Sequence, residues 1–302
     1  MKIGVIMGGT SSEREISLLT GNEMIKNLDS DKYEIIKIEI NSRKDLIEKV
    51  QENNIDFALL ALHGKFGEDG GAQAILESLG IPYSGCGVAS SVLCMDKDIS
   101  KKLMESAGVI TPKWIHLKKH QQVDYNLLNK MGYPIIVKPV NGGSSLGTVL
   151  VNNEDEVMDG VLRAFDYDDE IIIEEYISGI EITCGILNKK LLPILCIKPK
   201  SNFFDYKSKY QWNEADESVI ELDNELKSKV EAMCVQCWDL FKCEVYARID
   251  IIVSKNVPYV LEINTLPGMT ENSLLPKSAK AVGMEFEELL DTIITSSLKI
   301  KR

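Results

Sequence analysis

The sequence predicts a mixed fold, in which an α/β domain built on a parallel sheet is followed by α+β structure with antiparallel sheets. In the first 90 residues, short apolar runs of strand length alternate with helical segments, which is typical of a parallel sheet. Beyond residue 130, β-branched runs are separated by turns rich in Gly, Ser and Asn, as in antiparallel hairpins. With 302 residues, of which 44% are apolar, the chain can form two or three domains.

Composition narrows the classes of partner. The net charge of -12, from 46 acidic and 34 basic residues, argues against nucleic acid, which would require a basic surface. No apolar run approaches the roughly 18 residues of a membrane span, so we expect a cytoplasmic protein without membrane contact. Seven cysteines, an odd number without a secretion signal, indicate reduced thiols rather than a disulfide framework.

The first unit consists of a strand, a glycine turn and a helix. The apolar run at residues 2–7 is typical of a buried parallel strand, and Ser12 and Glu15 have the spacing of a capping box that would start the helix. Further elements alternate in the same way. Strands are expected at residues 33–40, 57–62 and 81–83, and helices at residues 43–51 and 72–79. A helical stretch follows, and we place the first domain boundary near residue 95.

Two loops of this region are candidate binding loops. In parallel sheets, ligands bind at the carboxyl ends of the strands, which is where residues 8–13 and 63–70 fall. The second loop is rich in glycine and begins with His63, which favours a functional role for that histidine over a structural one at a strand end. The first strand is not followed by G-x-G-x-x-G, so the dinucleotide fingerprint is absent.

A loop rich in glycine and serine lies between two predicted strands, at residues 134–139 and 148–151. It reads N-G-G-S-S-L-G, and such small residues expose backbone N–H groups to an anion. A Walker motif would end in Gly-Lys-Ser/Thr and lead into a helix, whereas here Lys138 precedes the glycines and a strand follows. We therefore predict a lid over nucleotide phosphates; the alternative is a mobile hairpin with Lys138 as a surface charge.

The second half contains further strands, a long loop and one long helix. Strands are expected at residues 171–177, 181–187 and 191–195, and a helix at about residues 222–240. Residues 198–223 are polar and aromatic with little periodicity. A loop of this length in a compact domain is usually functional or disordered, and its aromatic residues favour a docked loop.

Residues 244–264 read as a β-hairpin whose two faces differ. Alternation along the first strand puts its apolar residues on one face and projects Arg248 and Asp250 from the other. A turn centred on Asn256 pairs Asp250 with Glu262 and Arg248 with Asn264. On the return strand, the residues expected to share the apolar face are Tyr259, Leu261 and Ile263.

This pairing predicts a metal site. Two carboxylates directly opposite each other on a sheet repel, unless a cation lies between them. Two carboxylates and an amide are hard oxygen ligands, which suit Mg²⁺ held together with substrate phosphates. The alternative is a solvated hairpin face with scattered charges.

Seven motifs, in order along the chain, resemble those of bacterial D-alanine:D-alanine ligases of the ATP-grasp superfamily. They are G-G-T-S-S-E-R-E-I-S (8–17), A-L-H-G-K-F-G-E-D-G (61–70), M-D-K (95–97), V-K-P with G-G-S-S-L-G (137–147), F-D-Y-K-S-K-Y (204–210), R-I-D (248–250) and E-I-N-T-L-P-G-M-T-E-N-S-L (262–274). The resemblance covers essentially the whole chain. It implies an N-terminal α/β domain at residues 1–95 and two ATP-grasp domains at residues 96–178 and 179–302.

The resemblance also implies which residues bind each ligand. Those that would bind ATP are Lys97, Lys138, Ser145, Glu174, Glu175, Ile177, Glu181 and Lys209. Those that would hold two Mg²⁺ ions, with Mn²⁺ as an alternative metal, are Asp250, Glu262 and Asn264.

Substrate contacts follow from the same resemblance. Glu13 would bind the ammonium of the first D-alanine, with His63 near its carboxylate, and Ser273 and Leu274 would bind the carboxylate of the second. The residues implied in catalysis or loop closure are Arg248 and Gly268, at the tetrahedral oxyanion, and Ser144 and Tyr210, which would link the loops to Glu13. After Tyr210 the chain lacks the Pro-Ala stretch common in the family.

The implied reaction joins two D-alanines into D-alanyl-D-alanine through an acylphosphate, at the expense of ATP, for peptidoglycan precursor synthesis. A homodimer is expected. Three alternatives remain open from the sequence: a D-Ala:D-Ser ligase, a D-Ala:D-Lac ligase, and a non-catalytic ATP-binding regulatory module. The retained oxyanion residue Arg248 argues against the last of these, because binding alone does not require it.

Overall fold

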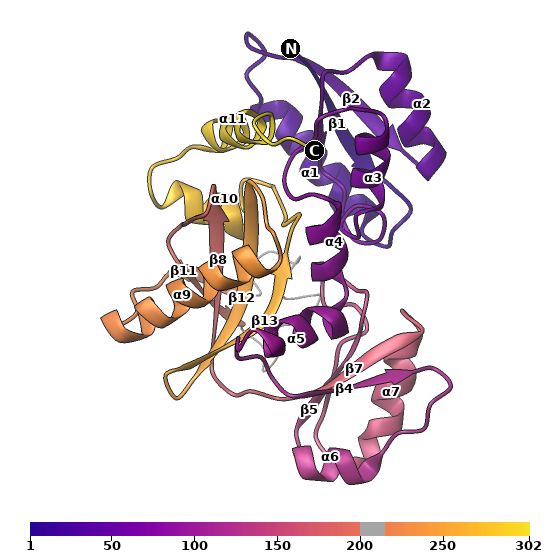
Figure 1. Cartoon of the computed structure of the whole chain (residues 1–302), viewed down its shortest axis with the longest axis vertical. Coiled ribbons are helices and arrows are strands. Elements are labelled where there is room, and N and C mark those ends of the chain that lie inside the picture. The colour runs from indigo at the N-terminus through magenta and orange to yellow at the C-terminus, as the bar shows by residue number, and fades with distance from the viewer. Residues whose placement is uncertain (200–214) are drawn as a thin grey trace.

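The computed structural model describes residues 1–199 and 215–302, which form three lobes (Figure 1). An N-terminal lobe lies at the top of the view, a lobe with the largest sheet in the middle, and a smaller lobe at the lower right. In the described part of the chain, no helix is both long enough and apolar enough to cross a membrane.

The N-terminal lobe has the expected parallel sheet. Its three strands have the order β2-β1-β3, and both pairings are parallel. Its elements are β1 (Lys2–Gly8), α1 (Arg14–Asn27), β2 (Glu34–Ile40), α2 (Arg43–Asn53), β3 (Phe57–Leu60) and α3 (Gly71–Ser78). The strand expected at residues 81–83 is wrong, because Tyr83 forms only an isolated bridge to Ala58. Two helices, α4 (Val88–Met95) and α5 (Lys97–Ser106), lead out of the lobe.

The start of α1 differs from the capping box expected there. The helix begins at Arg14, and its N-cap is Glu13, which makes no side-chain capping bond. The Glu13 carboxylate instead accepts a hydrogen bond from Ser144 Oγ, in the glycine- and serine-rich loop far along the chain. A contact between lobes therefore replaces the local cap, and sequence spacing alone does not reveal such a contact.

Gly8 ends β1 at a position where any side chain would be strained. Its φ is +93°, and an added Cβ would lie 2.5 Å from the Ile40 carbonyl oxygen. Gly8→Ala is expected to cost about 3 kcal/mol of unfolding free energy, from the left-handed backbone and the clash together. Gly80→Ala is the control, because φ there is +67° with no atom within 4 Å, so about 1 kcal/mol is expected. If urea unfolding showed that the two variants lose equal amounts of unfolding free energy, the predicted clash at Gly8 would be contradicted.

The smaller lobe is an antiparallel sheet covered by a helix. The strand order is β4-β7-β5-β6. Its elements are β4 (Trp114–Lys118), α6 (Tyr125–Met131), β5 (Ile135–Pro139), β6 (Val149–Val151), the 3-10 turn Glu154–Glu156, α7 (Val157–Phe165) and β7 (Glu170–Glu175). Helix α7 packs against β5, β6 and β7, and its buried residues join those strands in one apolar cluster. This packing covers one face of the sheet.

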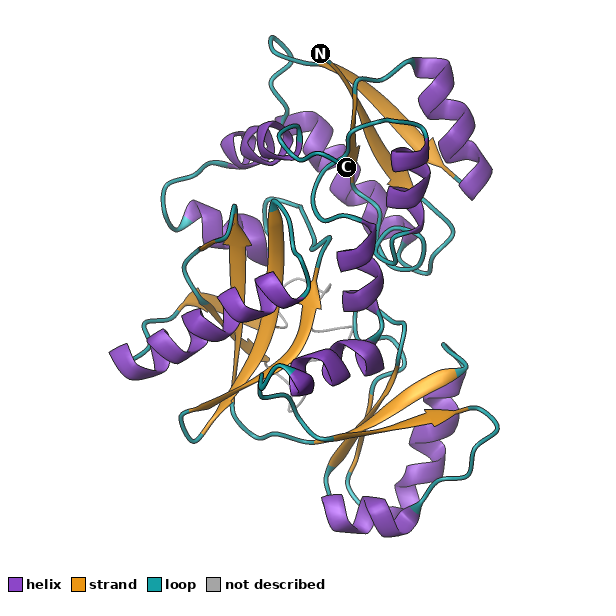
Figure 2. Cartoon of the chain, in the orientation of Figure 1, coloured by secondary structure: helices purple, strands orange, loops and turns teal. Residues whose placement is uncertain are grey.

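The middle lobe contains a six-stranded antiparallel sheet with the order β11-β10-β8-β12-β13, in which β9 also pairs with β8. The elements are β8 (Ile180–Leu187), β9 (Lys190–Leu191), β10 (Leu195–Pro199), β11 (Ala215–Val219), α9 (Asn224–Leu240), β12 (Tyr246–Ser254), β13 (Val257–Asn264) and α10 (Leu274–Lys280). The helix that follows, α11 (Phe286–Ser297), packs against the N-terminal lobe. Figure 2 shows α9 lying across one face of this sheet, where its buried residues pack against β8, β12 and β13. Helix α10 packs against β8 at Gly185 on the opposite face, and the rest of that face is available for a site.

The β12–β13 hairpin has the expected pairing at the end that carries the polar residues. Arg248 pairs with Asn264 and Asp250 with Glu262. The apolar face of β12 is buried as expected at Ala247, Ile249, Ile251 and Val253. Val245, expected on the same face, precedes β12 and is buried in the core of the N-terminal lobe instead. The polar side chains of β12 therefore lie on the face that α9 does not cover.

A β-bulge explains why the pairing was right although the turn was not. The turn is the two-residue segment 255–256, and both residues have positive φ. The register shifts between Asp250 and Ile251, which leaves Leu261 without a direct partner. The expectation that Tyr259, Leu261 and Ile263 share the apolar face is therefore wrong. Val260 and Ile263 are buried there, whereas the bulge turns Leu261 to the same side as its neighbour Glu262, where both line a cavity.

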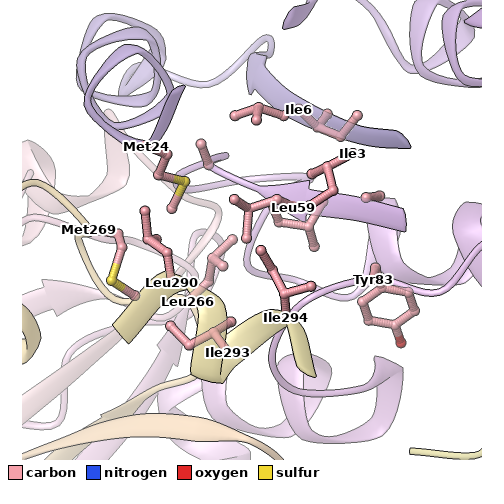
Figure 3. Packing of buried hydrophobic residues seen from close by; sticks show 14 of the residues in the cluster. Ile3, Ile6, Met24, Leu59, Tyr83, Leu266, Met269, Leu290, Ile293 and Ile294 are labelled. Atoms are coloured by element: carbon pink, nitrogen blue, oxygen red, sulfur yellow. The ribbon is translucent and has the colours of Figure 1, made fainter. Parts of the chain in front are cut away.

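The core of the N-terminal lobe includes residues from the end of the chain. Figure 3 shows Leu290, Ile293 and Ile294 of α11 packed beneath Ile3 and Leu59 of the parallel sheet. Leu266 and Met269, from the segment that follows β13, belong to the same cluster. The segment between β13 and α10 is thus anchored in the N-terminal core.

Candidate active site

A cavity of about 560 Å³ lies between the smaller lobe and the middle lobe, within the usual range for small-molecule sites. Seven of the residues expected around ATP line it: Lys97, Lys138, Ser145, Glu174, Glu175, Ile177 and Glu181. The eighth, Lys209, lies outside the described residues. Asp250 and Glu262 line the same cavity, so the structure brings the expected nucleotide and metal residues together.

The cavity wall combines apolar surface with charged groups. Its apolar residues come from both sheets and from the segments beside them, and include Ile136, Leu146, Ile180, Ile197, Ile252 and Leu261. Lysines and carboxylates interrupt this surface. Such a wall suits a ligand with a flat apolar part and a strongly charged part.

Glu174 is held ionised by two lysines. It is 3% exposed; its Oε1 accepts a hydrogen bond from Lys138 Nζ at 3.0 Å, and its Oε2 lies 2.5 Å from Lys101 Nζ. Burial alone would raise the pKa of this carboxyl, but the two ammonium groups outweigh burial and hold the pKa below its usual value. The result is a cluster with two positive charges and one negative charge.

Lys97 connects the glycine- and serine-rich loop to the hairpin. It is the first residue of α5, fixed there because Asp96 caps the helix by accepting from the Ile99 N–H at 2.8 Å. Lys97 Nζ donates to the Gly142 carbonyl at 2.5 Å and lies 3.9 Å from Glu262 Oε2. One ammonium group thus contacts both walls of the cavity.

Glu13 forms a second polar centre beside this loop. Its carboxylate is 4% exposed and accepts a hydrogen bond from Ser144 Oγ. Two glycines make room for it: an added Cβ would lie 2.5 Å from Glu13 Oε2 at Gly64 and 2.8 Å from it at Gly143. These glycines come from two lobes, so the buried charge lies where the N-terminal lobe meets the glycine- and serine-rich loop.

His63 lies next to this centre. It is 6% exposed, and its Nε2 is 3.0 Å from Thr20 Oγ1. Its backbone carbonyl accepts from Ser11 Oγ at 2.7 Å, which ties the two candidate loops of the N-terminal lobe together. Ser11 Oγ in turn accepts from the Glu13 N–H at 3.2 Å. His63 and Glu13 thus belong to the same corner of the site.

The negative charge of Asp250 on the hairpin is stabilised by more hydrogen bonds than the sequence predicted. It is 5% exposed and receives a forked pair of bonds from Arg248, at 2.9 and 2.8 Å, and one from Thr183 Oγ1, at 2.6 Å. Asn264 Nδ2 donates to it at 3.1 Å. The inference that only a cation could relieve the Asp250–Glu262 repulsion is therefore wrong, because Arg248 already neutralises Asp250. The alternative of a solvated hairpin face is wrong as well, because Asp250 is buried and lines the cavity.

The donor set on this hairpin still fits a hard cation. Asp250 and Glu262 are direct partners across the strands and face one cavity, and both offer oxygen atoms, as Asn264 does through its amide. Among residues 1–199 and 215–302, no three His, Cys, Asp or Glu side chains converge to hold a metal. A cation here would thus need the amide and a ligand's own oxygen atoms, an arrangement typical of Mg²⁺ bound with phosphates.

Gly268, Ser273 and Leu274 lie in the anchored segment between β13 and α10. Ser273 Oγ accepts from the Thr270 N–H at 3.0 Å, and Leu274 is the first residue of α10. An added Cβ at Gly268 would lie 3.1 Å from Ser273 Oγ, so the two residues are close neighbours. Tyr210, expected to close the site, lies outside the described residues.

Two residues of the site were missed from the sequence. Lys101 lies one turn after Lys97 on α5, and the four-residue spacing that puts both lysines on one helix face could have revealed it. Thr183 lies opposite Asp250 on the neighbouring strand β8, and only the pairing of non-adjacent strands brings the two together.

The chain matches family models over most of its length. The model described as "D-ala D-ala ligase C-terminus" matches residues 103–295, and the one described as "D-ala D-ala ligase N-terminus" matches residues 2–53 and 43–86. A D-alanine–D-alanine ligase of Clostridium perfringens is 56% identical over 302 residues, which is 100% of both chains. The chain belongs to the D-alanine–D-alanine ligase family.

Solved structures of D-alanine–D-alanine ligases share its fold. The ligase of Bacillus anthracis complexed with ATP has a TM-score of 0.91 at 51% identity, covering 99% of this chain and 98% of that one. The VanG D-Ala:D-Ser ligase of Enterococcus faecalis has a TM-score of 0.80 at 30% identity, covering 98% and 99%. The ATP-grasp fold expected for this D-alanine–D-alanine ligase family member is confirmed.

Proposed function

We propose that this family member joins two D-alanines into D-alanyl-D-alanine, with ATP converted to ADP and phosphate, as a step in peptidoglycan precursor synthesis. The observation that carries the proposal is the cavity between the smaller lobe and the middle lobe. It gathers lysines from α5 and β5 with the paired carboxylates of the hairpin. The identity of 56% over the full length of a D-alanine–D-alanine ligase supports the same substrates.

ATP fits the cavity by chemistry. The apolar wall suits the adenine ring, and Lys97 and Lys138 suit the phosphates. A relative with 51% identity is described in complex with ATP. Asp250, Glu262 and Asn264 would hold Mg²⁺, which when bound neutralises charge on the phosphate groups.

The reaction has two steps. The carboxylate of the first D-alanine, whose ammonium Glu13 would bind, attacks the γ-phosphorus of ATP, so that ADP leaves and an acylphosphate forms. The neutral amine of the second D-alanine then attacks the acyl carbon, which forms the C–N bond and a tetrahedral intermediate with an oxyanion. This intermediate loses the amine proton and expels phosphate to leave the amide. Arg248, held in place by Asp250, and the Gly268 N–H would stabilise the oxyanion between these events. The lid loop, linked to Glu13 through Ser144, would exclude water that could hydrolyse the acylphosphate.

Two alternatives concern the second substrate. The VanG D-Ala:D-Ser ligase shares the fold at 30% identity, whereas the D-alanine–D-alanine ligases of Bacillus anthracis and Clostridium perfringens named above are 51% and 56% identical, which favours D-alanine. The loop around Tyr210, where the sequence contains no histidine, favours a dipeptide ligase over a D-Ala:D-Lac ligase. A regulatory module without turnover is disfavoured, because Arg248 is present and positioned in the site.

A competition assay tests this specificity directly. The wild-type enzyme is supplied with ATP, Mg²⁺ and D-alanine, together with equal D-lactate or D-serine at pH 7 to 8, and the products are separated by mass. D-Alanyl-D-alanine is expected to predominate. Predominance of D-alanyl-D-lactate or D-alanyl-D-serine would reassign the enzyme, and ATP hydrolysis without any ligated product would refute the ligase function.

Lys138→Ala tests the nucleotide site. The substitution removes a charge-assisted contact worth about 1.5 to 3 kcal/mol, so kcat/KM for ATP should fall roughly 10- to 150-fold. Lys130→Ala, in α6 of the same lobe but outside the cavity wall, is the control, and its kcat/KM should stay within twofold. An unchanged kcat/KM in Lys138→Ala would count against the role of Lys138 at the phosphates.

Two further parts of the proposal concern the state of the enzyme. We expect it to be cytoplasmic, since the reaction consumes ATP, and to be a homodimer, as the family resemblance implies. Light scattering during size-exclusion chromatography distinguishes a mass near 33.7 kDa from twice that value.

A further inference from the structure

Lys101 is a buried charge with no part in the reaction outlined above. Its side chain on α5 is fully buried, and its Nζ lies 2.5 Å from Glu174 Oε2. The same ammonium donates to Thr111 Oγ1 at 2.7 Å and to the Pro112 carbonyl at 3.0 Å, and it lies 5.4 Å from the centre of the Trp114 ring. Burying an ammonium group is costly unless it is paired, so this arrangement is a built site rather than an incidental contact.

The charges around Glu174 do not balance. Lys101 and Lys138 both pair with this one carboxylate, which leaves one excess positive charge when all three groups are ionised. Among the described residues, the cavity wall includes Glu174 and Lys138 but not Lys101. The excess charge is therefore available to a ligand only through Lys138.

Building on the proposed function, we propose that Lys101 is a positioning residue for ATP binding: it neutralises Glu174 and so releases Lys138 to donate to the phosphate groups of the nucleotide. Without Lys101, Lys138 would be the only cation paired with Glu174 among the contacts described above. Its movement toward a phosphate would then leave a buried carboxylate unpaired, which is strongly unfavourable. Lys101 thus acts through Glu174 and Lys138, without touching the nucleotide.

The titration of Lys101 gives this role a pH dependence. Burial lowers the pKa of Lys101 to about 8; Glu174 and Glu175 of β7 oppose that change, and Lys138 of β5 adds to it. Below this pH the three-residue cluster carries an excess positive charge, and above it the cluster is neutral. Affinity for an anionic nucleotide should therefore fall as the pH rises through about 8.

The test is the dissociation constant for ATP with Mg²⁺ and without D-alanine, measured by titration calorimetry. Lys101→Met removes the charge and keeps an apolar side chain of similar length, and it should weaken binding about 10- to 100-fold. kcat at saturating ATP and D-alanine should fall much less than the affinity does. Lys102→Met is the matched control, since Lys102 is the next residue of α5, is 61% exposed and pairs with Asp98. Its affinity should stay within about twofold of wild type.

A double-mutant comparison separates positioning from general structural damage. If Lys101 acts by neutralising Glu174, then adding Lys101→Met to Glu174→Gln should weaken binding by less than about threefold, because no charge remains to neutralise. The proposal would be overturned if Lys101→Met weakened ATP binding by the same factor in the Glu174→Gln background as in the wild-type background. It would also be overturned if folded Lys101→Met bound ATP with an affinity within twofold of wild type.

Wild-type measurements decide the outcome if Lys101→Met does not fold. The dissociation constant of the wild-type enzyme should rise several-fold between pH 7 and pH 9, and a constant value would overturn the proposal. Wild-type protein that binds no ATP at any pH would refute the proposed function, and the role of Lys101 with it. Wild-type protein that binds ATP and ligates D-alanine, while Lys101→Met binds ATP equally well, would refute only the role of Lys101.

Discussion

Asp250→Asn is expected to lower kcat at least about a thousandfold while the protein stays folded. The substitution keeps the size of the side chain and removes its charge. Two functions of Asp250 are lost together: a negatively charged oxygen ligand facing the cavity, and the carboxylate that fixes the Arg248 guanidinium with two bonds. Steady-state release of phosphate with saturating ATP, Mg²⁺ and D-alanine measures the effect.

Asp239→Asn is the matched control for that variant. It makes the same chemical change on α9, at a carboxylate that is 57% exposed and pairs with Lys189. Surface pairs of this kind contribute about 0 to 1 kcal/mol, so activity should stay near that of wild type. Normal turnover of Asp250→Asn at ordinary Mg²⁺ concentrations would refute the hairpin site, and an unfolded variant would show a lost circular dichroism signal.

Glu13→Gln should raise the D-alanine concentration that half-saturates the first subsite by roughly 100-fold or more. Loss of one partner from a buried charge pair costs about 2 to 5 kcal/mol, and Glu13 is buried against Gly64 and Gly143 where water cannot compensate. The amide can still accept a bond from Ser144, so the lid contact is largely retained. The effect should therefore appear in D-alanine binding more than in ATP binding, which a two-site fit of phosphate release separates.

Glu15→Gln is the control for Glu13→Gln, because Glu15 lies two residues further along the chain and its side chain is 84% exposed. It should leave both D-alanine subsites unchanged. If both variants weakened D-alanine binding equally, the negative charge at the start of α1 would be responsible, and not a specific contact of Glu13 with the substrate. An unchanged first subsite in Glu13→Gln would remove Glu13 from substrate binding.

Local sequence patterns predicted most of the strands and the polar pairing, since these depend on side-chain periodicity. They missed β4, and they placed β11 inside a long loop. The alternation around Arg248 and Asp250 gave the correct register, although the turn was misplaced by half a residue. The compensating bulge at Leu261 was not predictable, because a bulge depends on which face of β13 the whole lobe buries. The face assigned to Tyr259 and Leu261 was therefore wrong.

Contacts between lobes were the main limit of the sequence analysis. Ser12 and Glu15 have the correct spacing for a cap, but the structure has a bond between Glu13 and Ser144 instead, across more than a hundred residues. No local pattern predicted that bond, and only the family resemblance led us to expect it. Arg248 was expected to serve an oxyanion, and its neutralisation of Asp250 could not be read from the pairing alone. The charge balance at Glu174 likewise depends on Lys101, which only tertiary packing brings to β7.

The shared core of the N-terminal sheet and α11 also affects how the chain folds during its synthesis. A ribosome releases the parallel strands before the other two lobes, yet Ile3 and Leu59 pack against Leu290, Ile293 and Ile294, which are made after both of those lobes. The nascent N-terminal lobe therefore carries an exposed apolar surface while the two lobes that bind the nucleotide are translated. The core of this lobe is complete only after α11 has emerged from the ribosome. A messenger RNA truncated before α11 therefore yields a protein whose first lobe lacks part of its core and is prone to aggregate.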